Sequence, residues 1–149
     1  MQDHLAQWKH NRDFLQDISP AFPDWMVNAS LYLSIHAIEA LLTADGTKAR
    51  SRHQDRFEIL QSEKRYEHIH ENFKVLYDLC HVTRYSANPK RWIPPERVEK
   101  EVVKRFVYAI EGSVRKLLAA AKPPVEMPHL PDIKIRTAPK AADPPPTTP

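Results

Sequence analysis

The amino-acid sequence predicts an all-α protein: an up-and-down bundle of four to five helices, followed by a disordered proline-rich tail. Glycine occurs only twice in 149 residues, and no run alternates β-branched with polar residues, so a β-sheet is disfavoured. Apolar residues instead recur every three or four positions in four segments, which is the spacing of amphipathic helices. Short connections between long helices make neighbouring helices antiparallel.

The first two helices are expected at residues 3–18 and 25–44. The first has one apolar face, which carries Leu5, Trp8, Leu15 and Ile18. Asp24 is a suitable N-cap for the second helix, and Gly46 follows it where glycine commonly ends a helix. The second helix is apolar on most of its circumference, which predicts that it lies at the centre of the bundle.

The third and fourth helices are expected at residues 51–85 and 95–121. Ser51 and Gln54 form a capping-box pattern, and a stripe at near-heptad spacing follows: Ile59, Tyr66, Ile69, Phe73, Leu76 and Cys80. This helix is long, so we expect a break within residues 81–83, and Pro89 stops it. Pro95 opens the fourth helix, whose inward residues are Val98, Val102, Phe106, Ile110 and Leu117.

The bundle is therefore expected to comprise residues 1–121, and the tail residues 122–149. Nine of the fourteen prolines lie in the tail, and a segment of this composition does not pack as a helix. We interpret it as a linker, with a tether or a partner-binding strip as alternatives.

The composition also bears on location and partners. The net charge of +3 is compatible with a polyanionic partner. Cys80 is the only cysteine, so no internal disulfide forms, and the first residues lack the apolar run of a signal peptide. Polar residues interrupt the longest apolar stretch, SLYLSIHAIEALL at 30–42, which makes it a poor membrane span. We expect a cytoplasmic protein without a membrane partner.

The sequence offers no motif for a metal or a cofactor, and neither is expected. It has no glycine-rich phosphate loop, no paired-cysteine site and no HExxH. The two histidines of HIH at 68–70 point about 200° apart on a helix, so they would not share one metal.

Two sets of residues near the helix 2–helix 3 connection could carry chemistry. His36 lies in the middle of the apolar block, where the alternative is a core histidine with hydrogen-bond partners. His53 and Arg56 are three residues apart and face one side of a helix, for which a polar helix start is the alternative.

Two further sets lie on the third helix. Arg65 and His70 are five residues apart, about 140° around the helix, and flank its apolar stripe. Arg84 and Tyr85 fall where this helix ends, a position at which a cation also suits the helix dipole.

The order of these pieces resembles a branch of the HEPN superfamily (higher eukaryotes and prokaryotes nucleotide-binding domains). The resemblance rests on PDWMVNASLYLSIHAIEALL, SRHQDRFEIL and YDLCHVTRYS, and it extends over about residues 3–120. The residues that carry it are Trp25, Leu31–Tyr32, His36, His53, Arg56 and Arg84–Tyr85. Leu31 stands where this branch has an aromatic residue.

This resemblance implies a fold and a set of activities. HEPN domains are bundles of four to five helices, are commonly dimeric, and many are metal-independent RNases that act as toxins or defence effectors. Their usual signature is Arg, four to six residues, then His, in a cleft at the dimer interface. Arg65 and His70 match that spacing, but Tyr66 stands where the motif has a polar residue. The chain thus lacks a clear standard signature.

We expect His36, His53 and Arg56 to share one pocket as the catalytic or anion-binding residues. Two imidazoles and a guanidinium bind phosphate, and their mutual repulsion lowers the histidine pKa values. An imidazole could take the proton from a ribose 2′-hydroxyl while the arginine stabilises charge on the phosphate. Arg65 and His70 are the weaker alternative.

Tyr32, Arg84 and Tyr85 are expected to contact the substrate, which is RNA or a nucleotide. Three functions stay open. The first is a metal-independent RNase or toxin-like effector that acts as a homodimer, with a protein partner such as an antitoxin. The second is a catalytically inactive module that binds a nucleotide or a protein, and the third is a structural bundle tethered by its tail.

Overall fold

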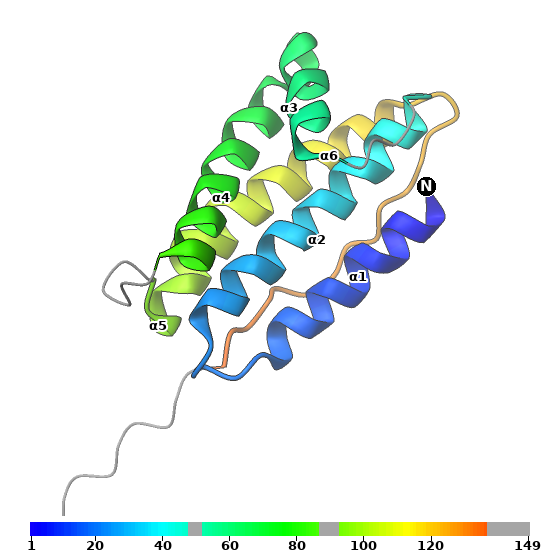
Figure 1. Cartoon of the computed structure of the whole chain (residues 1–149). Helices are drawn as coiled ribbons and strands as arrows, with labels where there is room; N and C mark the ends of the chain where they lie inside the picture. The colour runs from blue at the N-terminus through cyan, green and yellow to red at the C-terminus, as the bar shows by residue number, and fades with distance from the viewer. Residues whose placement is uncertain (48–51, 87–92, 137–149) are drawn as a thin grey trace, which may run out of the picture.

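The computed structural model describes residues 1–47, 52–86 and 93–136 (Figure 1). All regular elements in these ranges are helical, and the ranges contain no β-strand. The elements are α1 (Gln2–Asp17), α2 (Pro23–Ala44), α3 (His53–Ser62), the 3₁₀ turn η1 (Lys64–Tyr66), α4 (Glu67–Tyr85), α5 (Pro95–Val98), the π-helical segment η3 (Glu99–Val107) and α6 (Tyr108–Ala120). The prediction of an all-α bundle is confirmed.

Helix α2 forms the centre of the bundle. It packs against α1, α4, α5, η3 and α6, and fifteen of its twenty-two residues are buried. By length and hydropathy α2 could cross a membrane, but 83% of that apolar window is buried by the rest of the chain, as in a core helix. The predicted central position is therefore confirmed. Most of the apolar circumference of α2 is covered within one copy of the chain, although Trp25 and Tyr32 are exposed.

The expected third helix is divided at residues 63–66, not at 81–83. Glu63 is extended, and η1 then leads into α4, which continues unbroken to Tyr85. In one straight helix Phe57 and Phe73 would lie about 24 Å apart, whereas their ring centroids are 5.0 Å apart. The fold-back buries both Leu60 and Tyr66, and the Tyr66 hydroxyl donates a hydrogen bond to Asp45 at the end of α2. Ser51 of the proposed capping box lies outside the described residues.

The chain stays packed beyond α6, which corrects the expected end of the bundle at Ala121. Residues 121–136, which we call the strap, run as an extended segment along α1 and the η3–α6 helix (Figure 1). Met127, Ile133 and Ile135 of the strap are buried. Residues 122–136 thus pack on the bundle, because these three apolar side chains cover faces that the helices leave open. Residues 137–149 of the expected tail lie outside the described residues.

A buried ion pair connects α1, α6 and the strap. Arg12 Nη1 lies 2.8 and 2.9 Å from the two carboxylate oxygens of Glu111, and both side chains are 5% exposed. The Trp8 indole donates to the same carboxylate at 2.8 Å. Arg12 Nη2 donates to the Pro131 carbonyl at 2.5 Å. Every charged group in this cluster thus has partners, which a buried charge requires.

We predict that Arg12→Met destabilises the protein by about 3–5 kcal/mol, because Glu111 would keep a buried charge without its partner. Urea unfolding measures the difference. The matched control is Arg97→Met, which breaks the exposed Arg97–Glu101 pair and should cost at most about 1 kcal/mol. Equal losses in the two variants would contradict the assigned role of the buried pair.

Candidate functional site

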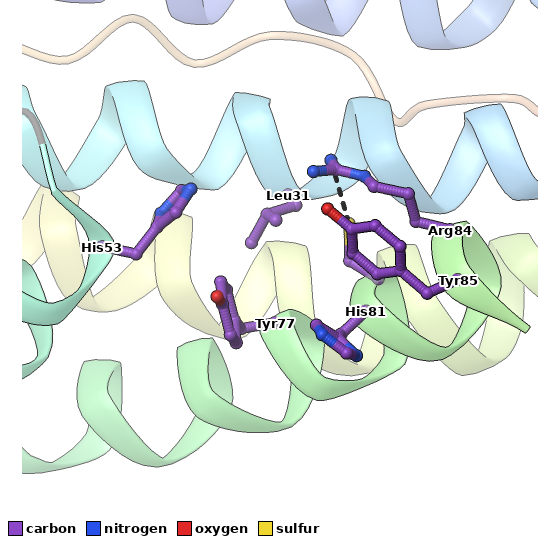
Figure 2. Close-up of a pocket in the computed structure, with 7 residues that line it drawn as sticks. Leu31, His53, Tyr77, His81, Arg84 and Tyr85 are labelled. Atoms are coloured by element: carbon purple, nitrogen blue, oxygen red, sulfur yellow. Dashed lines mark hydrogen bonds between the residues drawn. The ribbon is translucent and has the colours of Figure 1, made fainter.

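A pocket of about 480 Å³ lies where α3 folds back over α4. We call it the Arg84 pocket, and its lining residues are Leu31 from α2, His53 from α3, and Tyr77, Cys80, His81, Arg84 and Tyr85 from α4. Figure 2 shows His53 at one end and Arg84 with Tyr85 at the other, with Tyr77 and His81 between them. The break at residues 63–66 creates this arrangement, because it returns the start of α3 to the side of Tyr77.

Arg84 is held in position by an uncharged side chain. Its Nε and Nη2 atoms donate to Asn28 Oδ1 at 3.1 and 2.7 Å, and the Cys80 thiol donates to the same oxygen at 2.8 Å. Asn28 Nδ2 donates to the Asp24 carbonyl, which orients the amide. Arg84 is exposed and makes no ion pair among the described residues. The guanidinium is therefore fixed, while its positive charge is not neutralised.

Aromatic rings line the space beside Arg84. The rings of His81 and Tyr85 lie 4.7 Å apart, and those of His53 and Tyr77 lie 5.2 Å apart. Tyr85 is 67% exposed, so one end of the pocket has a ring face that a ligand can reach. Flat rings beside a cation can stack a base or another planar group.

His53 is held by a second, separate chain of contacts. Arg56 donates to Glu39 Oε1 at 2.6 Å, and Arg56 Nη1 lies 3.1 Å from His53 Nδ1. A guanidinium only donates, so His53 Nδ1 is the acceptor and the proton of the neutral ring is on Nε2. Burial, with the nearby charges of Arg56 and Arg84, lowers the pKa of His53. The ring is therefore neutral near pH 7, with Nδ1 occupied by Arg56 and the Nε2–H available as a hydrogen-bond donor.

The predicted trio is divided in the structure. His53 and Arg56 are in contact, as the spacing indicated. His36 Nδ1 instead lies 3.3 Å from His4 Nδ1 of α1, and His36 lines a different pocket, between α1 and α2. Burial, followed by the charge of His4, lowers the pKa of His36. The apolar surroundings of His36 were visible in the sequence, whereas its partner is 32 residues away.

The alternative pair is separated by the helix break. Arg65 lies in η1, where it contacts Glu63 at 2.6 Å and Asp45 at 3.3 Å. His70 lies on α4 with the edge of its ring against Phe57. No described contact joins Arg65 to His70. The regular α-helical spacing on which this motif depends is absent here, because Arg65 lies in the 3₁₀ turn η1 and α4 begins only at Glu67.

Several lining residues were not among the predicted site residues. Tyr77, Cys80 and His81 line the Arg84 pocket, and Asn28 holds Arg84 beside it. Asn28 could have been noticed as a polar residue in an apolar helix, but its partner Arg84 is 56 residues away. The predicted Tyr32 is 44% exposed and lines the α1–α2 pocket, while its side chain also interacts with Arg84. No cluster of three or more His, Cys, Asp or Glu side chains that could bind a metal occurs in the described ranges.

We predict that stability falls as the pH drops from about 7 to 5. The pKa values of His36 and His53 are lower in the folded protein than the ordinary 6.5. The unfolded chain therefore binds protons more readily, so stability is complete above the unfolded pKa and is lost below it. Urea unfolding across this pH range measures the decline.

The double variant His36→Gln and His53→Gln should show a shallower decline than the unchanged protein. His10→Gln is the control, because His10 is exposed on α1. A decline that is equally steep in the double variant would show that other groups govern it.

Comparison with known proteins adds no family assignment. No protein-family model matches the chain, no curated protein matches it, and no solved structure matches it. The fold is therefore described from the structure itself, and the HEPN resemblance rests on the spaced residues quoted from the sequence.

Proposed function

We propose that this protein is a HEPN-like module that binds a phosphate-bearing ligand, an RNA strand or a nucleotide, in the Arg84 pocket. The observation that carries the proposal is the state of Arg84, which is exposed and held by Asn28 rather than by a carboxylate. A phosphate could take two hydrogen bonds from such a guanidinium. None of the seven lining residues is acidic, so nothing in the lining repels an anion.

The surroundings of the pocket favour the same ligand. Arg84 also acts electrostatically on His53 at the other end of the pocket, so its positive charge is felt along the lining. Tyr85 and His81 provide ring faces for a base beside the phosphate position. His53, Arg84 and Tyr85 are also residues that carry the HEPN resemblance, which supports a nucleotide-type ligand over an unrelated anion.

Metal-independent RNA cleavage is the second candidate, and one observation favours it. Two imidazoles, His53 and His81, line the same pocket as the Arg84 guanidinium. His81 could take the proton from a ribose 2′-hydroxyl, and water could protonate the leaving oxygen. The Nε2–H of His53 could donate a hydrogen bond to the phosphate, while Arg84 stabilises its charge. In this case the protein is a toxin-like effector, and a homodimer and an antitoxin-like partner are proposed from the resemblance alone.

We predict that Arg84→Gln weakens binding of a fluorescent oligoribonucleotide by about tenfold to a hundredfold, because a charge-assisted hydrogen bond is worth about 1.5–3 kcal/mol. Fluorescence anisotropy measures the affinity, and thermal melting checks the fold. Arg97→Gln is the matched control, since Arg97 lies on α5 with Glu101 as its partner. Equal weakening in both variants would show that the oligoribonucleotide binds through general charge attraction and not in the Arg84 pocket.

Cleavage has a separate test in purified protein incubated with total RNA in EDTA. We expect RNA fragments if the pocket is catalytic, and their loss in His53→Gln and in His81→Gln. His70→Gln should cleave normally, because His70 belongs to the alternative pair outside this pocket. Loss of cleavage in His70→Gln alone would show that the Arg65–His70 pair, and not the Arg84 pocket, carries the activity. Intact RNA with retained binding would leave the non-catalytic module as the function.

A further inference from the structure

A second pocket, of about 180 Å³, lies between α1 and α2, and its lining is mostly apolar. We call it the α1–α2 groove. Its lining includes Gln7, Asn11, Phe14, Trp25, Tyr32 and His36. Phe14, Trp25 and Tyr32 are 51%, 58% and 44% exposed, and Phe22 beside Trp25 in the chain is also exposed. A cluster of large exposed aromatic side chains marks a binding surface.

The strap ends beside this groove. Arg136 Nη2 lies 2.8 Å from Asp17 Oδ1, and the Lys134 N–H donates to the Gln16 side chain at 3.5 Å. Asp17 is the last residue of α1, and Phe14 of the groove lies one turn before it. The chain that follows Arg136 therefore starts at the groove end of α1, as a continuation of a segment that is already packed on the bundle.

The sequence that follows Arg136 has the composition that such a groove binds. Residues 138–149 read APKAADPPPTTP, with three consecutive prolines, Pro144–Pro146. Proline-rich segments favour the polyproline II helix, which has no internal hydrogen bonds and whose rings pack on aromatic side chains. The Trp25 indole and the Asn11 amide, both in the groove lining, can donate to its carbonyls.

The length of the connection permits this docking. The seven residues 137–143 span about 22 Å when extended, at roughly 3.1 Å per residue. The end of a helix is about 10–12 Å across, so the chain can pass around the end of α1 and reach Trp25. The strap occupies the Arg12 and Gln16 side of α1, and the groove lies on the Asn11 and Phe14 side.

We propose that residues 138–149 bind the α1–α2 groove of the same chain, with Pro144–Pro146 against Trp25 and Tyr32. This inference is independent of the function proposed for the Arg84 pocket. It identifies the groove as a site for a proline-rich segment, which the chain itself supplies.

The first test is photocrosslinking in the full-length protein. Phe14→p-benzoylphenylalanine places a photoreactive ring in the groove, and mass spectrometry identifies the crosslinked peptide. We expect crosslinks to residues 138–149. Val75→p-benzoylphenylalanine is the matched control, because Val75 is also exposed but lies on α4, and it should not reach that segment.

Mixing isotope-labelled and unlabelled chains distinguishes the sources of the crosslink. Crosslinks within one chain support the proposal. Crosslinks to residues 138–149 of another copy would contradict docking within one chain and would show that two copies exchange these segments. Crosslinks to the helices of another copy would show that a dimer covers the groove. The absence of crosslinks to residues 138–149 would overturn it.

The second test uses tryptophan fluorescence. In a Trp92→Phe background, Trp25 is the exposed reporter, because Trp8 is buried. Replacing Pro144, Pro145 and Pro146 by serine should shift the emission to longer wavelength and increase quenching by acrylamide. Thr147→Ala with Thr148→Ala is the control, which should leave both unchanged. Identical spectra and quenching for the serine variant and the control would contradict the proposal.

Discussion

The buried pair of Arg12 and Glu111 is the constraint on which the rest of the bundle depends. It joins the first and last long helices, and the same guanidinium also holds the strap through the Pro131 carbonyl. A buried charge is tolerated only when its hydrogen bonds are complete, so α1, α6 and the strap can dock in one register. The Arg12 guanidinium also lies over the rings of Trp8 and Tyr108. This register places α2 at the centre and sets the end of α1 beside the strap.

The Arg84 pocket depends on a different contact, at the opposite end of the α3–α4 pair from Arg84. The Tyr66 hydroxyl donates to Asp45, and burial together with this carboxylate raises the pKa of Tyr66. The phenol therefore stays protonated and keeps donating. Because Asp45 ends α2, the contact ties the α3–α4 turn to the central helix. The first turn of α3 then lies beside Tyr77 and brings His53 into the pocket.

Three arginines that are held by other side chains differ in whether their charge is neutralised. Arg12 and Arg56 each meet a buried carboxylate, so their charges are compensated within the core. Arg84 meets an amide oxygen and a thiol instead, and it faces solvent. The position of Arg84 is thus fixed by neutral partners, and its charge remains available to an anion. This contrast separates a structural arginine from one that is suited to binding.

The sequence by itself determined the helices and their inward faces. Leu5, Trp8 and Leu15, or Ile69, Phe73 and Leu76, recur at helical spacing, and each set is buried, because periodicity is a local property of the chain. The contact between His53 and Arg56 could be predicted from the sequence for the same reason, since the two residues are one helical turn apart. The prolines after Lys122 excluded another helix, and residues 123–136, the part of this segment that the structure describes, contain none.

Only the tertiary structure decided where the long third helix breaks, which residues meet in the pocket and how far the packed chain extends. The break contains neither glycine nor proline, and Asp45, which stabilises it, is 21 residues from Tyr66. His36 meets His4, and Asn28 meets Arg84, across 32 and 56 residues. Ile133 and Ile135 of the strap find their apolar surroundings only once α1 and α6 are joined. Such contacts depend on docking geometry, which the spacing of residues along one helix does not encode.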